Sequence, residues 1–333
     1  MAKKIAINGF GRIGRLTFRN LLDMKDVEVV AINDLTDNAT LAHLLKYDSA
    51  QGKFDGTVEA TEEALIVNGK KINSYSQRNP EDLPWEALDI DLVLECTGIF
   101  RTKEMASKHL TAGAKDVLIS APAKGSGVQT IVLGVNEHEL DRRANVFSNA
   151  SCTTNCLAPV IKLINDNWGV EVGSMTTIHS YTSDQRIQDA PHSDLRRSRA
   201  AAYNMLPTST GAAIAVGLVV PEVAGKLFAI SVRVPVITGS LIEVNVMLNK
   251  KATVDEVNAV FKNAAQEGPM KGYLTYTEDP IVSSDIMRDK SSSIFDSLMT
   301  SVNGNMLKVV SWYDNEAGYS ARLADLAHLI LTK

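Results

Sequence analysis

Short apolar runs alternate with polar or helical segments through the first 150 residues of the chain. The first run ends at Asn8, and others follow at 27–32, 65–67, 92–96, 117–120 and 131–135. Strands of a parallel sheet give such continuous runs because helices cover both faces of the sheet. The alternation therefore predicts a doubly wound α/β sheet, and with it a first domain over residues 1–150.

After residue 150 the apolar runs become longer and richer in β-branched residues. They lie at 174–179, 227–234, 241–248, 293–302 and 306–312, and the last two flank an Asn303-Gly304 turn signal. Helical patterns occupy 211–219 and 253–266. We expect an α+β second domain over 151–314 with a mostly antiparallel sheet. An amphipathic pattern at 318–331 predicts a terminal helix, within about 315–333, that packs back onto the first domain.

Three glycines, Gly9, Gly11 and Gly14, lie between the first apolar run and a helical pattern. This G-x-G-x-x-G arrangement of strand, tight turn and helix is typical of Rossmann-type dinucleotide-binding domains. Asp34 closes the second run, where a carboxylate can accept hydrogen bonds from the ribose hydroxyls. Because the charge of Asp34 also repels a 2′-phosphate, the pattern favours NAD over NADP.

The stretch 148–156, SNASCTTNC, precedes an apolar helical pattern and contains a candidate nucleophile. Ser151 is a candidate N-cap, which puts Cys152 in the first helical turn. There the helix dipole and the unpaired N–H groups lower the pKa of a thiol from its usual value of about 8.5. A small cysteine packed as a hydrophobe is the alternative interpretation. His179, at the end of a strand pattern, is either a core histidine or the base that pairs with Cys152.

Two polar segments are candidates for anion binding. Residues 208–211, TSTG, precede an apolar helix and form either an anion site at the helix start or a simple N-cap. The segment between His179 and Pro207 is long, polar and weakly periodic, which is typical of a functional loop or an interface. Its arginines at 196, 197 and 199 form a solvated face, or at least one of them binds an anionic substrate.

Composition narrows the class of protein. The 333 residues include 34 Lys and Arg against 39 Asp and Glu, a net charge of −5 that gives no electrostatic reason to expect nucleic acid. Three cysteines are an odd number for a disulfide framework, which points to a reducing compartment. We see no signal-type segment, no membrane-spanning window and no metal-ligand pattern. The expected location is the cytoplasm, with no membrane partner.

Five stretches together carry a close resemblance to one family. They are INGFGRIGR at 7–15, SNASCTTNCLAP at 148–159, HSYTSDQR at 179–186, LPTSTGAA at 206–213 and SWYDNEAGYS at 311–320. The chain resembles the phosphorylating, NAD-dependent glyceraldehyde-3-phosphate dehydrogenases from its first residues to its last helix. The resemblance implies a two-domain fold, a homotetramer, a glycolytic role, and glyceraldehyde 3-phosphate and inorganic phosphate as substrates.

The resemblance also assigns roles to individual residues. Cys152 resembles the nucleophile and His179 its base. The family's two phosphate sites correspond to Ser151, Thr153, Thr210, Gly211 and Arg197 for one phosphate and to Thr182 and Arg233 for the other. The residues that resemble the NAD contacts are Arg12, Ile13, Asp34, Arg78, Ser120 and Asn315.

Three other functions remain open on the sequence. Erythrose-4-phosphate dehydrogenase shares the cysteine and the fold, but its thioester is hydrolysed. A cysteine hydrolase or acyltransferase would also use a Cys–His pair, although the glycine pattern and Asp34 argue against it. A non-catalytic binding protein with this fold would not need Cys152 and His179.

Overall fold

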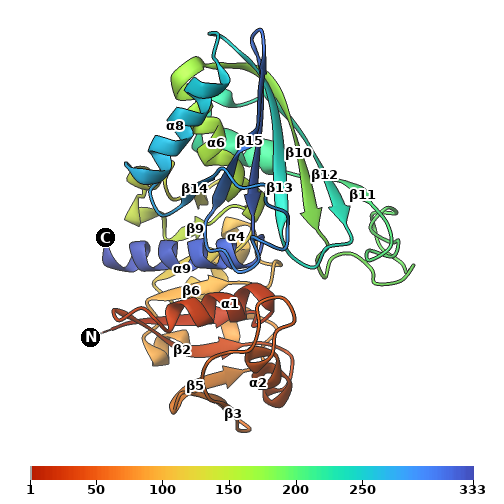
Figure 1. Ribbon diagram of the computed structural model, residues 1–333. Helices are drawn as coiled ribbons and strands as arrows, with labels where there is room; N and C mark the ends of the chain where they lie inside the picture. The colour runs from red at the N-terminus through yellow and green to blue at the C-terminus, as the bar shows by residue number, and fades with distance from the viewer. Residues whose placement is uncertain (1) are drawn as a thin grey trace. The chain divides into compact units, whose positions relative to one another are not determined.

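The computed structural model describes residues 2–333, which form two compact units. The first unit comprises the residues up to 131 together with 138–150 and 320–333. The second comprises 132–137 and 151–319. Figure 1 labels the elements of both units, with the chain coloured from the N-terminus to the C-terminus.

A nine-stranded sheet runs through the described part of the first unit, in the order β3-β4-β5-β2-β1-β6-β7-β9-β8. Its central strands are parallel, as predicted, whereas β3, β4 and β5 pair antiparallel. Asn68 and Gly69 both have positive φ, +51° and +77°, so a tight two-residue turn joins β4 to β5 and reverses the chain. The strands are β1 Lys3–Asn8, β2 Val27–Asn33, β3 Val58–Ala60, β4 Ala64–Val67, β5 Lys70–Tyr75, β6 Leu92–Glu95, β7 Asp116–Ile119, β8 Gln129–Thr130 and β9 Val146–Ser148.

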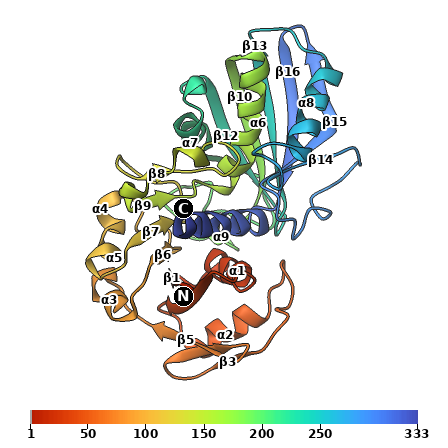
Figure 2. The ribbon, with the colours of Figure 1, turned by 90° about the vertical axis from the view of Figure 1, so that its left-hand side faces the viewer.

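Helices cover both faces of this sheet, which explains why its central strands read as continuous apolar runs. Figure 2 shows α3, α4 and α5 on one side of the sheet and α1 and α9 on the other. The backbone carbonyl of Ile330 in α9 accepts a hydrogen bond from Arg142 of the same unit. The helices are α1 Arg12–Leu21, α2 Asn38–Lys46, α3 Trp85–Leu88, α4 Lys103–Ala106, α5 Lys108–Thr111 and α9 Ala317–Thr332.

The strand predicted at 131–135 is wrong. Strand β8 ends at Thr130, and the following residues form a turn. The backbone N–H of Val132 donates to the side chain of Asn136 at 2.8 Å rather than to a neighbouring strand, and Gly134 has φ +84°. The apolar run is explained by burial alone, because Ile131 and Val132 are both fully buried.

The second unit contains a sheet in the order β11-β12-β10-β13-β16-β15-β14. Its pairings are mostly antiparallel, as predicted, and the exceptions are β10 with β12 and β14 with β15. The predicted turn at Gly304 joins β15 to β16. The strands are β10 Val170–Ser180, β11 Leu206–Ser209, β12 Leu227–Val234, β13 Ser240–Leu248, β14 Leu274–Thr277, β15 Ser293–Asn303 and β16 Met306–Tyr313.

Helices α6 Cys152–Trp168, α7 Ala212–Val219 and α8 Val254–Gln266 pack on one face of this second sheet (Figure 2). The last two confirm the helices predicted at 211–219 and 253–266. Helix α8 begins with a capping box in which Thr253 and Glu256 bond to each other's backbone N–H. Apolar side chains are exposed on β12, where Phe228 is 72% exposed and Ile230 52%.

Among residues 2–333, no helix combines the length and the apolar character needed to cross a bilayer. Within the same residues, no three His, Cys, Asp or Glu side chains gather closely enough to hold a metal ion.

Candidate active site

The start of α6 holds the candidate nucleophile. Ser151 is the N-cap, as predicted, and its Oγ accepts a hydrogen bond from the backbone N–H of Thr154 at 3.0 Å. Cys152 is the first helical residue. Just before it, Ala150 adopts a left-handed φ of +54°, a strained conformation for a residue with a Cβ. The chain therefore turns sharply into α6.

His179 lies beside the thiol, near the end of β10. Its Nε2 is 3.5 Å from Cys152 Sγ, and its Nδ1 is 2.6 Å from the carbonyl oxygen of Ser180. With the ring proton on Nδ1, that proton is donated to the Ser180 carbonyl and the lone pair of Nε2 faces the thiol. The structure thus brings together the two residues that the sequence proposed as a pair, at a distance from which His179 can act as a base in that tautomer.

Burial and one arginine set the charge of this pair. Burial, together with the guanidinium of Arg233, lowers the pKa of His179 to about 3, so the imidazole is neutral at pH 7. Arg233 Nη1 lies 2.9 Å from His179 Nδ1 and also donates to the Ser180 carbonyl at 3.2 Å. Their approach is fixed by the register of β10 and β12, in which His179 is directly opposite Arg233.

The prediction of a lowered pKa for the Cys152 thiol is wrong. Burial raises the pKa of this thiol, although the charge of Arg233 and the N–H and hydroxyl of Thr153 act in the opposite direction. The cost of removing the thiolate from water therefore outweighs the stabilisation that the start of α6 gives it. Burial also raises the pKa of Cys96 and Cys156, to about 12 each, so both are inert at neutral pH. The thiols of all three cysteines are free.

Sequence reasoning missed Tyr313, the last residue of β16. Its side chain is buried, and its hydroxyl bridges Thr153 Oγ at 2.9 Å and Thr177 Oγ at 2.8 Å. The ring also meets that of His179 edge to face, with centroids 5.9 Å apart. Tyr313 therefore ties the first turn of α6 to β10, the two elements that carry Cys152 and His179. A tyrosine at the end of a strand gave no signal of this role.

The predicted anion ligands of the second unit lie on neighbouring segments. The Nε of Arg233 is buried and has no hydrogen-bond partner. Thr182 bonds to Gln185 through its backbone N–H at 2.9 Å. Arg197 forms an ion pair with Asp184, and its Nη2 approaches the carbonyl of Ser209 at 3.4 Å. The polar segment thus brings Arg197 next to the residues that precede α7.

The start of α7 has the features of an anion site. Gly211 is its exposed N-cap, without a side-chain cap and without an acidic residue in the first turn. The hydroxyl of Thr210 accepts from the backbone N–H of Ala212 at 3.2 Å, so the N-cap alternative also describes part of the geometry. Of the other two arginines in the run, Arg199 pairs with Asp189 and both side chains are exposed.

The glycines of the first unit are explained by close approach. A Cβ on Gly14 would lie 2.2 Å from the carbonyl oxygen of Gly9, and one on Gly9 would lie 2.7 Å from the backbone nitrogen of Thr97. A Cβ on Gly11 would meet nothing within 4 Å, and Gly11 caps α1 without a side chain or an acidic first turn. This open, uncapped helix start fits a dinucleotide pyrophosphate.

The other predicted cofactor residues are divided between the units. Asp34 follows β2, and its carboxylate accepts from the backbone N–H groups of Phe10 at 2.8 Å and Thr36 at 2.9 Å. Arg12 pairs with Asp48 at 3.1 Å. Ile13 lies in the first turn of α1, Arg78 is exposed after β5, and Ser120 follows β7. Asn315 lies in the second unit, where its Oδ1 accepts hydrogen bonds from the hydroxyls of Ser180 and Ser240.

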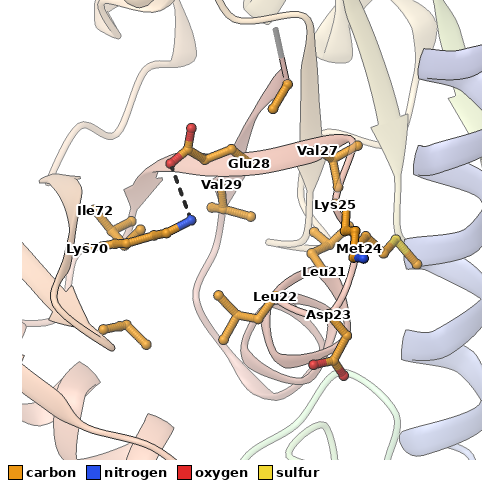
Figure 3. A pocket seen from close by; sticks show the side chains of 12 residues that line it. Leu21, Leu22, Asp23, Met24, Lys25, Val27, Glu28, Val29, Lys70 and Ile72 are labelled. Carbon is orange, nitrogen blue, oxygen red and sulfur yellow. Dashed lines mark ion pairs between the residues drawn. The ribbon is translucent and has the colours of Figure 1, made fainter.

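A cavity of about 310 Å³ lies elsewhere on the first unit (Figure 3). The residues around it come from the end of α1 and the loop after it, from the beginnings of β2 and β5, and from Ala2 and Val67. Lys70 and Glu28 face each other across it, with Nζ and Oε1 4.0 Å apart. Ligands of such sheets bind at the carboxyl ends of the strands, so this cavity is at the wrong edge for the cofactor.

Comparison with known proteins is consistent with this geometry. Residues 3–103 match the family described as glyceraldehyde 3-phosphate dehydrogenase, NAD binding domain, and residues 151–315 match its C-terminal domain. Glyceraldehyde-3-phosphate dehydrogenase 2 of Streptomyces avermitilis is 57% identical over 329 residues, covering 98% of each chain. The glyceraldehyde-3-phosphate dehydrogenase of Geobacillus stearothermophilus is 55% identical over 335 residues, covering 100% of this chain and 99% of its own. The chain therefore belongs to the glyceraldehyde-3-phosphate dehydrogenase family.

Proposed function

We propose that this protein oxidises and phosphorylates D-glyceraldehyde 3-phosphate to 1,3-bisphosphoglycerate, with reduction of NAD, in glycolysis and gluconeogenesis. The observation that carries the proposal is the contact between Cys152 Sγ and His179 Nε2 at the start of α6, in a chain of this family. The relatives at 53–57% identity carry the name of this enzyme.

The first step is addition of Cys152 to the aldehyde. Because the thiol pKa is raised and the imidazole is neutral, the resting pair is a thiol beside an imidazole rather than an ion pair. His179 Nε2 therefore takes the thiol proton as the C–S bond forms, and it returns that proton to the aldehyde oxygen. The backbone N–H of Cys152 is a candidate donor to the developing oxyanion. The product is a hemithioacetal on Cys152.

Oxidation of the hemithioacetal leaves a thioester. His179 accepts the hydroxyl proton, and NAD, when bound, supplies the hydride acceptor. The residues that would hold NAD are Arg12, Ile13, Asp34, Arg78, Ser120 and Asn315, and the uncapped start of α1 suits its pyrophosphate. Inorganic phosphate then attacks the thioester carbonyl and expels the Cys152 thiolate, which recovers a proton.

Two anion sites would serve the two phosphates. Arg233, with an unsatisfied buried Nε, and Thr182 are proposed to bind the phosphate of the aldehyde. The attacking phosphate would bind at the starts of α6 and α7, which offer backbone N–H groups and hydroxyls, together with Arg197, whose Nη2 lies 3.4 Å from the Ser209 carbonyl just before α7. The residues proposed for it are Ser151, Thr153, Arg197, Thr210 and Gly211.

Replacement of Cys152 by serine tests the assignment. The variant should form no NADH from glyceraldehyde 3-phosphate, while its affinity for NAD stays near that of the wild type, because the glycine turn and Asp34 are unchanged. Retained turnover would refute the role of Cys152.

Omission of inorganic phosphate separates the proposed reaction from that of erythrose-4-phosphate dehydrogenase. A phosphorylating enzyme should stop after one turnover per site without phosphate, and arsenate should restore turnover. Continued NADH formation without either anion would indicate thioester hydrolysis, and release of acid without NAD would indicate a cysteine hydrolase.

Assembly and location are proposed on separate observations. The polar segment exposes apolar side chains, with Ile187 85%, Leu195 81% and Tyr203 87% exposed, and β12 exposes Phe228. Further copies of this chain would cover them in a homotetramer. The free thiols suit a reducing cytoplasm. Sedimentation of the purified protein as a monomer would refute the tetramer.

A further inference from the structure

A buried carboxylate lies at the end of β6 in the first unit. Glu95 is 1% exposed. Its Oε1 accepts hydrogen bonds from the backbone N–H of Thr97 at 2.9 Å and from the hydroxyl of the same residue. Its Oε2 accepts from Asn8 Nδ2 at 2.5 Å and lies 3.0 Å from His109 Nε2. Each oxygen of the Glu95 side chain therefore has two polar partners.

His109 is a neutral donor to this carboxylate. The indole N–H of Trp85 can only donate, and it points at His109 Nδ1 from 3.0 Å. Nδ1 must therefore accept, which leaves the ring proton on Nε2, the atom that faces Glu95. Both rings are fully buried. Trp85 thus fixes the tautomer in which His109 holds Glu95.

A second chain of hydrogen bonds leads from Glu95 to the turn after β5. Asn8 Oδ1 accepts from Asn33 Nδ2 at 2.7 Å. Asn33 also clamps the backbone of Gln77, accepting from its N–H at 2.8 Å and donating to its carbonyl at 2.9 Å. Gln77 immediately precedes Arg78, one of the proposed NAD ligands. The donors Gln77 N–H, Asn33 Nδ2 and Asn8 Nδ2 form a relay directed toward Glu95, and Asn33 Nδ2 also donates in the opposite direction to the Gln77 carbonyl.

The network joins the loops that follow the parallel strands at their carboxyl ends. Asn8 precedes the glycine turn, Asn33 precedes Asp34, and Thr97 begins the loop after β6. This is the edge at which dinucleotides bind in such sheets. Asn8 lies one residue before the glycine turn, and Asn33 lies one residue before Asp34. In the loop after β6, the backbone nitrogen of Thr97 lies beside Gly9, 2.7 Å from the position that a Cβ on Gly9 would take.

We propose that Glu95 is a positioning residue for NAD. Its carboxylate, oriented by His109, holds the three loops in the arrangement that accepts the cofactor, so that less ordering is required on binding. The inference rests on the proposed function in one respect, namely that NAD occupies this edge of the sheet. It assigns a role to residues outside the glycine pattern.

Glu95→Gln tests the inference because it keeps the shape of the side chain. The new amide must turn its NH₂ toward either the Thr97 donors or those of Asn8 and His109, so one arm of the network is broken. The dissociation constant for NAD, measured by calorimetry, should rise about tenfold or more. The kcat at saturating NAD and the KM for the aldehyde should change by less than about threefold.

Four further variants make the result decisive. Val117→Ala removes buried side-chain volume from β7 without touching the network, so it should lower the melting temperature but leave NAD affinity unchanged. His109→Gln can still donate to Glu95 and should bind NAD better than His109→Leu. If Glu95→Gln does not fold, Asn33→Ala provides the test. It removes the contacts to Gln77 and the hydrogen bond to Asn8 Oδ1 but keeps the contacts of Glu95 itself, and it should also weaken NAD binding about tenfold.

Four outcomes would overturn the proposal while leaving the proposed function intact. The first two are an NAD affinity within about threefold of the wild type in Glu95→Gln, or in Asn33→Ala if Glu95→Gln does not fold. The third is that Val117→Ala weakens NAD binding as much as Glu95→Gln does. The fourth is that His109→Gln and His109→Leu bind NAD with the same affinity. Failure of the wild-type protein itself to bind NAD would instead overturn the proposed function, and the inference with it.

Discussion

Tyr313→Phe should measure how strongly the nucleophile's helix is tied to the base's strand. The substitution removes one hydroxyl and, with it, the hydrogen bonds to Thr153 at 2.9 Å and Thr177 at 2.8 Å. Each neutral hydrogen bond contributes about 1 kcal/mol net, so the pair contributes about 2 kcal/mol to the free energy of unfolding. Thr177 keeps the carbonyl of Leu241 as an acceptor at 3.1 Å, whereas the buried Thr153 hydroxyl loses its tyrosine partner.

The thermal midpoint is the appropriate measurement, at a fixed scan rate. A loss of about 2 kcal/mol corresponds to a decrease of about 4–8 °C for a unit of this size. Tyr47→Phe is the matched control, since Tyr47 is 46% exposed and its hydroxyl has water available in either state. It should not move the midpoint.

Activity provides the second readout of Tyr313→Phe. Because Thr153 follows Cys152 directly, a loosened first turn of α6 should lower kcat more than it raises the KM for the aldehyde. A midpoint within about 1 °C of the wild type, together with unchanged kcat, would refute the reasoning.

Four other expectations follow from the same structure. Asp34→Gly should weaken NAD binding and reduce the preference for NAD over NADP, measured as the ratio of kcat/KM for the two cofactors. An unchanged ratio would show that Asp34 does not distinguish the two cofactors at the ribose. Arg233→Lys should mainly impair use of the phosphorylated aldehyde relative to glyceraldehyde, and Arg197→Lys should raise the KM for inorganic phosphate, because lysine lacks the planar fork. Since burial raises the thiol pKa, alkylation of Cys152 by iodoacetamide should keep accelerating above pH about 8.5, and a plateau below that value would contradict the burial effect. The free energy of unfolding should decrease as the pH falls from about 6.5 toward about 3, because His179 binds a proton in the unfolded chain but not when buried in the folded protein. His179→Gln should flatten this part of the plot of melting temperature against pH. An unchanged slope would refute the expectation.

The sequence by itself determined the type of fold and most of the local structure. Continuous apolar runs predicted the parallel centre of the first sheet, and Ser151 before an apolar helical pattern predicted the start of α6. These are local properties, set by side-chain periodicity and capping chemistry over a few residues. The run at 131–135 shows the limit of periodicity, because a buried turn and a buried strand have the same apolar composition.

The tertiary structure decided the electrostatics and the supporting contacts of the site. A helix start alone predicted a lowered thiol pKa, but burial reverses the direction, and burial depends on what the rest of the second unit packs around Cys152. Likewise, Tyr313 lies 160 residues from Thr153, and Glu95 is 87 residues from Asn8 in the chain. Such contacts depend on strand order and register, so no local pattern of residues could specify them.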